Sequence, residues 1–328
     1  MNVSAETLPQ TETGRPRRWR KPLLAVLLLV VVAIVMLAAY RPVGTIRAVS
    51  HFSLRLEGYR SEYTQIGPYR IHYFVGGEGP PVLLVHGLGS RADDWALTMK
   101  DLRSHYRVYA IDLLGHGYSD WPQIDYSIQQ QSDMVREFMV SQKIVPADLV
   151  GISMGGWVSL QLASQHPEMV RRLVLIDSAG LQFETKLTVD SFSPTTPAEL
   201  ATFYELLTPK ARPLPGFLVR DLLRLLGNHS WVAHRILSTI KTGQDELEGK
   251  LQAVTMPVLM IWGKEDRITP LSEAEDMKRA MPQASMVVIP GCGHIALLDC
   301  WDSVRPPLTN FLAAENLPPN APVTSEGK

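Results

Sequence analysis

The residue with the clearest chemical potential is Ser153, in the segment Gly151-Ile152-Ser153-Met154-Gly155. An apolar run precedes this G-x-S-x-G segment and a helical pattern follows it, so we expect the serine at a tight turn between a strand and a helix. Such a turn holds the serine at positive φ and crowds the residues two before and two after it. Gly151 and Gly155 avoid the clash that side chains would cause there. The pattern is typical of a serine nucleophile.

A serine hydroxyl is a weak nucleophile at neutral pH and needs a base. Asp266 follows a predicted strand over 257–262, and His294 follows another over 285–289. Ser153, Asp266 and His294 therefore each stand beyond the carboxyl end of a strand, in the chain order that accompanies this turn. We predict a triad in which His294 takes the proton of Ser153 and Asp266 orients His294.

The negative charge that forms on an attacked acyl group also needs partners. We expect two backbone N–H donors, one from Met154 at the start of the following helix and one from Leu88, just after His86-Gly87. His86 is expected to brace that turn through hydrogen bonds. Acyl transfer by these groups requires no metal ion and no organic cofactor.

Other polar residues are candidates for the same site. Asp177 ends the strand over 172–177 at the same sheet edge, so it is an alternative acid to Asp266. His116 is expected to support its loop, like His86. His229 and His234 are five residues apart, a spacing that does not put two ligands on one helix face, so no metal site is predicted.

These residues require a sheet whose strand ends converge. Short apolar strands alternate with helical patterns after a hairpin over 63–75, and this order predicts a doubly wound, mostly parallel sheet with right-handed crossovers. The alternation stops over 181–254, where only helical spacing occurs, so we predict an inserted helical cap. Its expected helices are Pro197–Leu207, Gly216–Leu226 and Trp231–Ile240. The apolar face of the second helix either packs on the core or forms a lid that lines an acyl pocket or touches lipid.

The N-terminal region carries a membrane signal. Leu23–Tyr40 is eighteen residues without a charge, which makes a helix of about 27 Å, close to a hydrocarbon core of about 30 Å. Cleavage as a signal peptide after Ala39 would put the large Leu37 where a small residue is needed, so an anchor is favoured. The basic residues before the helix predict a cytoplasmic N-terminus and an extracytoplasmic, periplasmic catalytic domain, although four arginines after it weaken the asymmetry.

Composition argues against nucleic acid as a partner and allows a large hydrophobic core. The formal net charge of −1 over 328 residues argues against nucleic acid, and 45% hydrophobic residues suffice for a large core. The segment 41–60 mixes aliphatic and basic residues and is either an amphipathic segment on an anionic membrane surface or a linker.

Cys292 and Cys300 are expected to be free and buried, although an oxidising compartment would permit pairing. Oligomeric state is not predicted.

The expected organisation follows from these features. It comprises a basic tail (1–22), a transmembrane helix (23–40), a juxtamembrane segment (41–60), the first part of the core (61–180), the cap (181–254), the second part of the core (255–314) and a disordered tail (315–328).

Five motifs together resemble the α/β-hydrolase superfamily over roughly 63–311. They are His86-Gly87, Asp112-Leu113-Leu114-Gly115-His116-Gly117, Gly151–Gly156, Trp262-Gly263-Lys264-Glu265-Asp266 and Gly293-His294. The resemblance implies an α/β-hydrolase fold with the cap inserted. A single N-terminal membrane helix before a capped core is similar to membrane-anchored bacterial lipases and phospholipases and to monoacylglycerol-lipase-like hydrolases.

That likeness implies a serine hydrolase of carboxylic esters, above all of membrane-derived lipids such as monoacylglycerols, lysophospholipids or phospholipids. The resemblance also implies that the haloalkane dehalogenase and epoxide hydrolase relatives use aspartate at the position of Ser153. A serine there therefore argues against those two activities. Three alternatives stay open: a carbon–carbon bond hydrolase, a general short-chain esterase, and an inactive membrane-tethered binding protein. A serine-directed fluorophosphonate probe separates the last from the others, because an inactive triad is not labelled.

Overall fold

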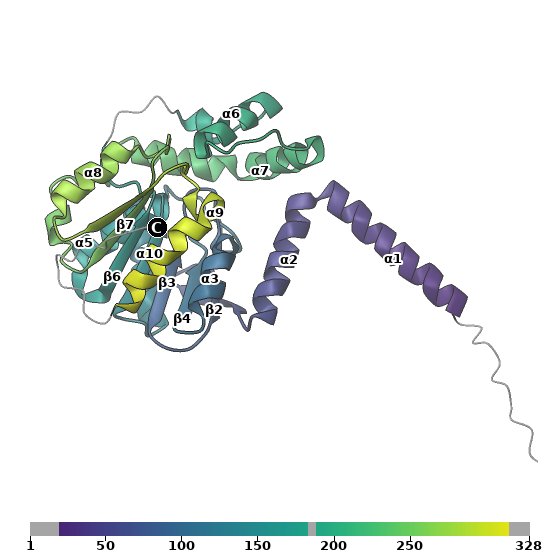
Figure 1. Cartoon of the computed structure of the whole chain (residues 1–328), viewed down its shortest axis with the longest axis horizontal. Coiled ribbons are helices and arrows are strands. Elements are labelled where there is room, and N and C mark those ends of the chain that lie inside the picture. The colour runs from purple at the N-terminus through teal and green to yellow at the C-terminus, as the bar shows by residue number, and fades with distance from the viewer. Residues whose placement is uncertain (1–19, 183–187, 315–328) are drawn as a thin grey trace, which may run out of the picture.

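The computed structural model describes residues 20–182 and 188–314 (Figure 1). Most of the predicted basic tail and all of the predicted disordered tail lie outside the described residues.

An eight-stranded sheet forms the centre of the molecule. Its strands are β1 (Arg60–Ile66), β2 (Tyr69–Gly76), β3 (Pro81–Val85), β4 (Arg107–Ile111), β5 (Ala147–Ile152), β6 (Val170–Ile176), β7 (Val258–Gly263) and β8 (Ser285–Ile289). They lie in the order β1-β2-β4-β3-β5-β6-β7-β8. The hairpin β1–β2 pairs antiparallel to β4 at one edge, and every other pairing is parallel. The predicted open, mostly parallel α/β sheet is confirmed.

Helices cover both faces of this sheet. The helices are α1 (Arg20–Tyr40), α2 (Pro42–Leu56), α3 (Ala96–Leu102), α4 (Ile128–Ser141), α5 (Met154–Gln165), α6 (Pro197–Leu207), α7 (Gly216–Ile240), α8 (Leu271–Ala280), α9 (Ala296–Asp299) and α10 (Trp301–Ala313). Short 3₁₀ turns cover Ala92–Trp95, Pro167–Met169, Val189–Phe192 and Leu251–Ala253. Side chains of α4, α5 and α8 pack on one face, and those of α2, α3 and α10 pack on the other.

The central strands are apolar because both of their faces are covered. In β3, Leu83 belongs to one apolar cluster and Leu84 to the other, and both are fully buried. Successive side chains of a strand point to opposite faces, so a strand between two helical layers needs apolar residues at every position.

Residues 188–254 contain the helices α6 and α7, which lie at one end of the sheet (Figure 1). Helix α6 begins where its sequence demands, because Thr196 caps it, Pro197 occupies its first turn and Glu199 completes a capping box. The expectation of two separate helices over 216–226 and 231–240 is wrong. The chain forms one helix of 25 residues, because Gly227 lies in open space and a helical glycine costs only about 1 kcal/mol.

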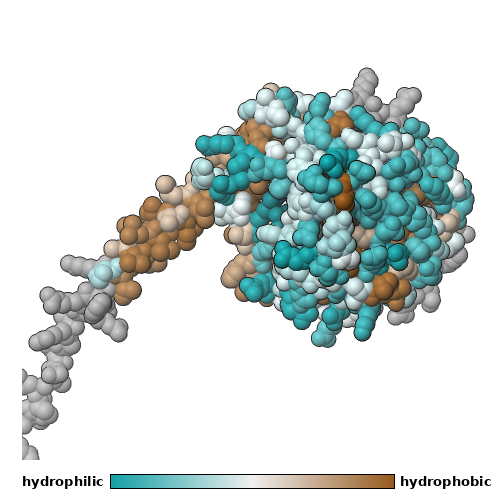
Figure 2. Space-filling view, turned by 180° about the vertical axis from the view of Figure 1, so that it is seen from behind, coloured by the Kyte–Doolittle hydropathy of each residue, from teal (hydrophilic) through white to brown (hydrophobic). Residues whose placement is uncertain are grey.

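Helix α1 projects away from the body as an apolar rod (Figures 1 and 2). Its segment Pro22–Tyr40 is long and apolar enough to cross a membrane, and none of it is buried against the described part of the chain. A helix with apolar residues all round and no protein cover is typical of one that meets lipid.

Helix α2 is docked on the body rather than extended as a linker. The backbone N–H of Val43, in its first turn, donates to Asp221 Oδ2 of α7 over 3.0 Å, and Leu54 near its end is buried. On the outer side, Ile46 and Phe52 are each 63% exposed. The juxtamembrane segment therefore has one packed face and one uncovered apolar face.

The expectation of free cysteines is wrong, because Cys292 and Cys300 form a disulfide. The turn after β8 and the short helix α9 bring the two Cα atoms to 6.3 Å, a separation that a disulfide spans. Such bonds persist mainly in oxidising compartments.

Candidate active site

Ser153 occupies the expected tight turn between β5 and α5, with φ 53° and ψ −124°. A Cβ on Gly151 would lie 2.5 Å from the carbonyl oxygen of Gly155, as the crowding argument requires. A Cβ on Gly155 would lie 2.2 Å from the carbonyl oxygen of Val85. The second glycine is therefore needed chiefly because the turn presses against the end of β3, a contact between segments far apart in sequence.

The structure brings Ser153, His294 and Asp266 together at the carboxyl edge of the sheet. His294 Nε2 lies 2.8 Å from Ser153 Oγ, and His294 Nδ1 lies 2.8 Å from Asp266 Oδ2. The histidine and the aspartate are each only 7% exposed. The arrangement has the geometry in which a histidine accepts a serine proton while a carboxylate orients the imidazole.

Thr269 is a member of this cluster that sequence reasoning missed. Its Oγ1 donates to Asp266 Oδ2 over 2.8 Å and lies 3.2 Å from His294 Nδ1. The backbone N–H groups of Ile268 and Thr269 donate to Asp266 Oδ1 over 2.8 and 3.0 Å. These bonds hold the carboxylate in one orientation. The signal in the sequence is the spacing D-x-x-T after a strand, in which an aspartate caps its own following turn.

Asp177, the alternative acid, has another position. Its Oδ1 accepts a hydrogen bond from the backbone N–H of Gly263 over 2.7 Å, and no bond to His294 is found in the described part of the chain. Burial, and then the neighbouring charge of Asp266, raise the pKa of Asp177 well above its usual range. Asp266, and not Asp177, therefore faces the histidine.

The turn after β3 lies against the serine. A Cβ on Gly87 would lie only 3.0 Å from Ser153 Cβ, so glycine permits this close approach. Leu88 and Met154 line the same cavity as Ser153. Within the ranges that the structure describes, neither of their backbone N–H groups has a protein acceptor. Two donors therefore remain available to a ligand beside the serine hydroxyl.

Two buried histidines support the neighbouring loops. His86 Nε2 accepts from the backbone N–H of Leu113 over 3.1 Å, and its Nδ1 donates to the carbonyl oxygen of Gly87 over 2.8 Å. His116 Nδ1 donates to the carbonyl oxygen of Leu114 over 3.0 Å. Burial lowers the pKa of His86 and lowers that of His116 to about 3, so both rings are neutral at physiological pH.

A mostly apolar cavity of about 320 Å³ opens at Ser153, and we call it the acyl cavity. Trp157 forms part of its core side, while Phe192, Leu237 and Ile240 contribute from the region of the predicted cap. The lining residues of α7 come from its C-terminal half. The apolar face of 216–226, one of whose two predicted roles is to line an acyl pocket, does not line this cavity.

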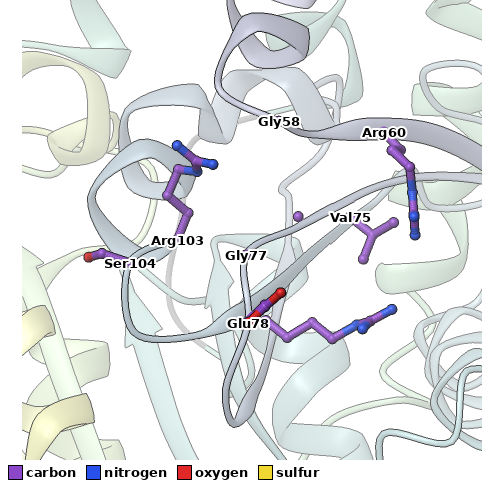
Figure 3. A pocket seen from close by; sticks show the side chains of 9 residues that line it. Gly58, Arg60, Val75, Gly77, Glu78, Arg103 and Ser104 are labelled. Atoms are coloured by element: carbon purple, nitrogen blue, oxygen red, sulfur yellow. The ribbon is translucent and has the colours of Figure 1, made fainter.

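A different hollow, of about 540 Å³, lies at the opposite edge of the sheet (Figure 3). Figure 3 shows Arg60 and Arg103 on its two sides, with Val75 between them. Arg60 pairs with Glu62 and Arg103 pairs with Glu57. Arg107, also in its wall, begins β4, so this hollow lies at the amino ends of the parallel strands, away from the edge where such sheets bind ligands.

His229 and His234 both lie on α7, and no group of three or more metal-ligating side chains is found in the described ranges. His229 instead lies against Trp121, with ring centroids 4.2 Å apart.

Known proteins resemble this chain along most of its length. Residues 82–305 match the alpha/beta hydrolase family. The chain is 33% identical over 259 residues to 2-hydroxymuconate semialdehyde hydrolase of Pseudomonas putida, covering 75% of this chain and 91% of that protein. It is 26% identical over 302 residues to the monoacylglycerol lipase ABHD6 of Rattus norvegicus, covering 85% of this chain and 90% of that protein.

A solved structure resembles a larger share of the chain. The crystal structure described as a membrane phospholipase A, a bacterial virulence factor, superposes with a TM-score of 0.77 at 28% identity, covering 89% of this chain and 98% of that chain. The range 82–305 that matches the family contains the serine turn, Asp266 and His294. The chain belongs to the alpha/beta hydrolase family.

Proposed function

We propose that this hydrolase cleaves carboxylic esters, with Ser153 as nucleophile, His294 as general base and Asp266 as the acid that orients it. The observation that carries the proposal is the hydrogen-bonded series from Ser153 Oγ through His294 to Asp266, which opens into the apolar acyl cavity. A buried imidazole between a hydroxyl and a carboxylate is the arrangement that activates serine.

The reaction follows from these positions. His294 accepts the serine proton as Oγ attacks the acyl carbon, and the resulting oxyanion is stabilised by the N–H groups of Leu88 and Met154. Each such donor lowers the barrier by about 3–4 kcal/mol in enzymes of this type. The alcohol leaves with the proton from His294, and the same histidine then activates the water that hydrolyses the acyl-serine.

Lipid esters are the substrates that this site favours. The acyl cavity has apolar walls suited to a hydrocarbon chain, and α1 provides an anchor that keeps the site at a bilayer. Two of the similar proteins are a monoacylglycerol lipase and a membrane phospholipase A, which supports the same substrate class. We further propose that the N-terminus is cytoplasmic and the catalytic domain extracytoplasmic, a compartment in which the disulfide is stable.

The test is hydrolysis by full-length protein in detergent, with Ser153→Ala as the matched control. The substrates are p-nitrophenyl esters from short to long chains, a monoacylglycerol and a lysophospholipid. We expect activity on the acyl lipids and a loss of at least about 10⁴-fold in the variant. Activity confined to short esters would contradict the lipid assignment, and activity that survives in Ser153→Ala would contradict the mechanism.

Carbon–carbon bond cleavage is the second candidate, and the 33% identity to 2-hydroxymuconate semialdehyde hydrolase favours it. The substrate in that protein's name, a hydroxymuconate semialdehyde, carries a carboxylate, an enol and an aldehyde along one conjugated chain. Loss of its absorbance in the presence of the enzyme, without hydrolysis of any ester, would shift the assignment to this reaction.

A further inference from the structure

A second, smaller cavity of about 70 Å³ adjoins the acyl cavity, because Leu88 lines both. We call it the polar cavity. Its wall includes Arg47 from α2, Trp121 from the loop after β4, and His229 from α7. A space of this volume accommodates a group of a few heavy atoms, since one water molecule takes about 30 Å³ in the liquid.

Arg47 places a positive charge at the polar cavity without an acidic partner in the described ranges. It is half-buried, and within the described ranges it forms no hydrogen bond or ion pair. Arg91, which also lines the cavity, is neutralised by an ion pair with Asp93 and stacks over the ring of Tyr118 at 4.4 Å.

The histidines beside Arg47 carry no charge. The pKa of His116 falls to about 3, chiefly because of burial, and the pKa of His229 is lowered by burial and then by the charge of Arg47. Asp94 is the acidic group nearby, but its carboxylate accepts hydrogen bonds from the Ser90 hydroxyl and the Arg91 N–H and does not line the cavity. Among the residues that the structure describes, Arg47 is therefore the one unpaired cation that lines this cavity, and it lies beside neutral imidazole rings.

We infer that the polar cavity binds the phosphate of a lipid head group, with Arg47 as the residue that recognises it. The inference rests on the proposed function and narrows its substrates to lysophospholipids or phospholipids in preference to monoacylglycerols. Because the acyl cavity and the polar cavity meet at Leu88, an ester held at Ser153 has its acyl chain in the first and its phosphorylated alcohol in the second. A guanidinium suits a phosphate because it donates two parallel hydrogen bonds.

The juxtamembrane helix is thus part of the binding site. Its position is fixed at the N-terminal end by the bond from Val43 N–H to Asp221 and in the middle by His51, whose Nε2 lies 3.1 Å from Asp93 Oδ2. Arg47 lies between these two attachments. A protein that lacks residues 1–60 loses Arg47 together with the anchor, so such a truncation alone cannot separate the two effects.

The test compares Arg47→Gln with Arg55→Gln, a matched loss of charge at an exposed position of the same helix. Full-length variants hydrolyse a lysophospholipid and a monoacylglycerol with the same acyl chain in the same detergent. We expect Arg47→Gln to lower the ratio of the two kcat/KM values about tenfold, or about 1.4 kcal/mol. Arg47→Lys should lower it less, and Arg55→Gln should leave it unchanged. Equal losses on both substrates in Arg47→Gln would overturn the inference.

A binding experiment separates this inference from the proposed chemistry. An ether-linked lysophospholipid, its uncharged alkylglycerol counterpart and inorganic phosphate are titrated into Ser153→Ala protein, with and without Arg47→Gln. If Arg47→Gln weakens binding of the ether lysophospholipid but not of the alkylglycerol, the inference is supported whatever reaction the enzyme catalyses. Binding that is indifferent to Arg47, or binding of inorganic phosphate without preference for the phospholipid, contradicts it.

Discussion

Cys292 is bonded to Cys300, and His294 lies within the short loop that this disulfide closes. The bond therefore restrains the segment that carries the base of the proposed triad. Gly263 at the end of β7 also lies against this loop. A Cβ on Gly263 would lie only 2.4 Å from the Gly293 carbonyl oxygen. The loop is thus held both covalently and by contact with the end of β7.

Reduction of this disulfide should destabilise the protein. Closing a loop of this length contributes about 2.5 kcal/mol through the unfolded chain, so Tm should fall by about 5–10 °C in reductant. Thermal unfolding with and without reductant measures the change. A variant with both cysteines replaced by serine is the control, since its Tm should not respond to reductant. An unchanged Tm for the native protein would contradict the prediction.

Glu273 should make stability depend on pH. The side chain is 1% exposed, its Oε1 accepts the backbone N–H of Leu181 over 3.1 Å, and burial raises its pKa to about 8. Between the usual value near 4.5 and 8, the folded state keeps a proton that the unfolded state has lost. Stability from this group is therefore complete below about pH 4.5 and is lost as the pH rises through 8.

Glu273→Gln removes this titration while its side-chain oxygen can still accept the Leu181 N–H. The shift corresponds to a cost on the order of 5 kcal/mol above pH 8. We expect the variant to gain stability over the native protein as the pH rises from 5 to 9, measured by denaturant unfolding at each pH. Parallel pH curves for the two proteins would show that Glu273 does not titrate in this window.

Two glycine substitutions should have opposite effects. Gly155→Ala places a Cβ 2.2 Å from the Val85 carbonyl oxygen, so this variant should lose several kcal/mol or fail to fold. Gly227→Ala lies in an exposed turn of α7 with no atom within 4 Å of the added Cβ. It should gain about 0.5–1 kcal/mol, because alanine restricts the unfolded chain and favours the helix. Denaturant unfolding of both variants provides the measurement.

Asp221 should control the attachment of α2. Its carboxylate accepts the Val43 N–H and also pairs with Arg224, whose Nη2 lies 2.6 Å from Oδ1. Asp221→Ala removes a cap worth about 1 kcal/mol from the N-terminus of α2. We expect faster amide exchange over 43–47 and a lower lysophospholipid preference, because Arg47 is then less well positioned. Arg224→Gln is the control, since it keeps the bond to Val43.

The local sequence predicted most of the proposed catalytic machinery. Gly151 and Gly155 on either side of Ser153 specify a backbone turn that few other residues tolerate, and that constraint acts within five residues. Strand periodicity located the ends of β5, β7 and β8, where the serine, the aspartate and the histidine lie. An uncharged run of eighteen residues likewise specifies a helix that can meet lipid, whatever the rest of the chain does.

Only the tertiary structure decided the features that depend on contacts between segments far apart in the sequence. Asp177 and Asp266 both follow strands of the same sheet, and only the path of the turn after β7, with Thr269, brings Asp266 to His294. The pairing of Cys292 with Cys300 needed the loop geometry, which brings their Cα atoms to 6.3 Å. Arg47 reaches the cavity at Leu88 because α2 docks on α7 through the bond from the Val43 backbone N–H to Asp221, a contact between segments 178 residues apart that no local pattern encodes.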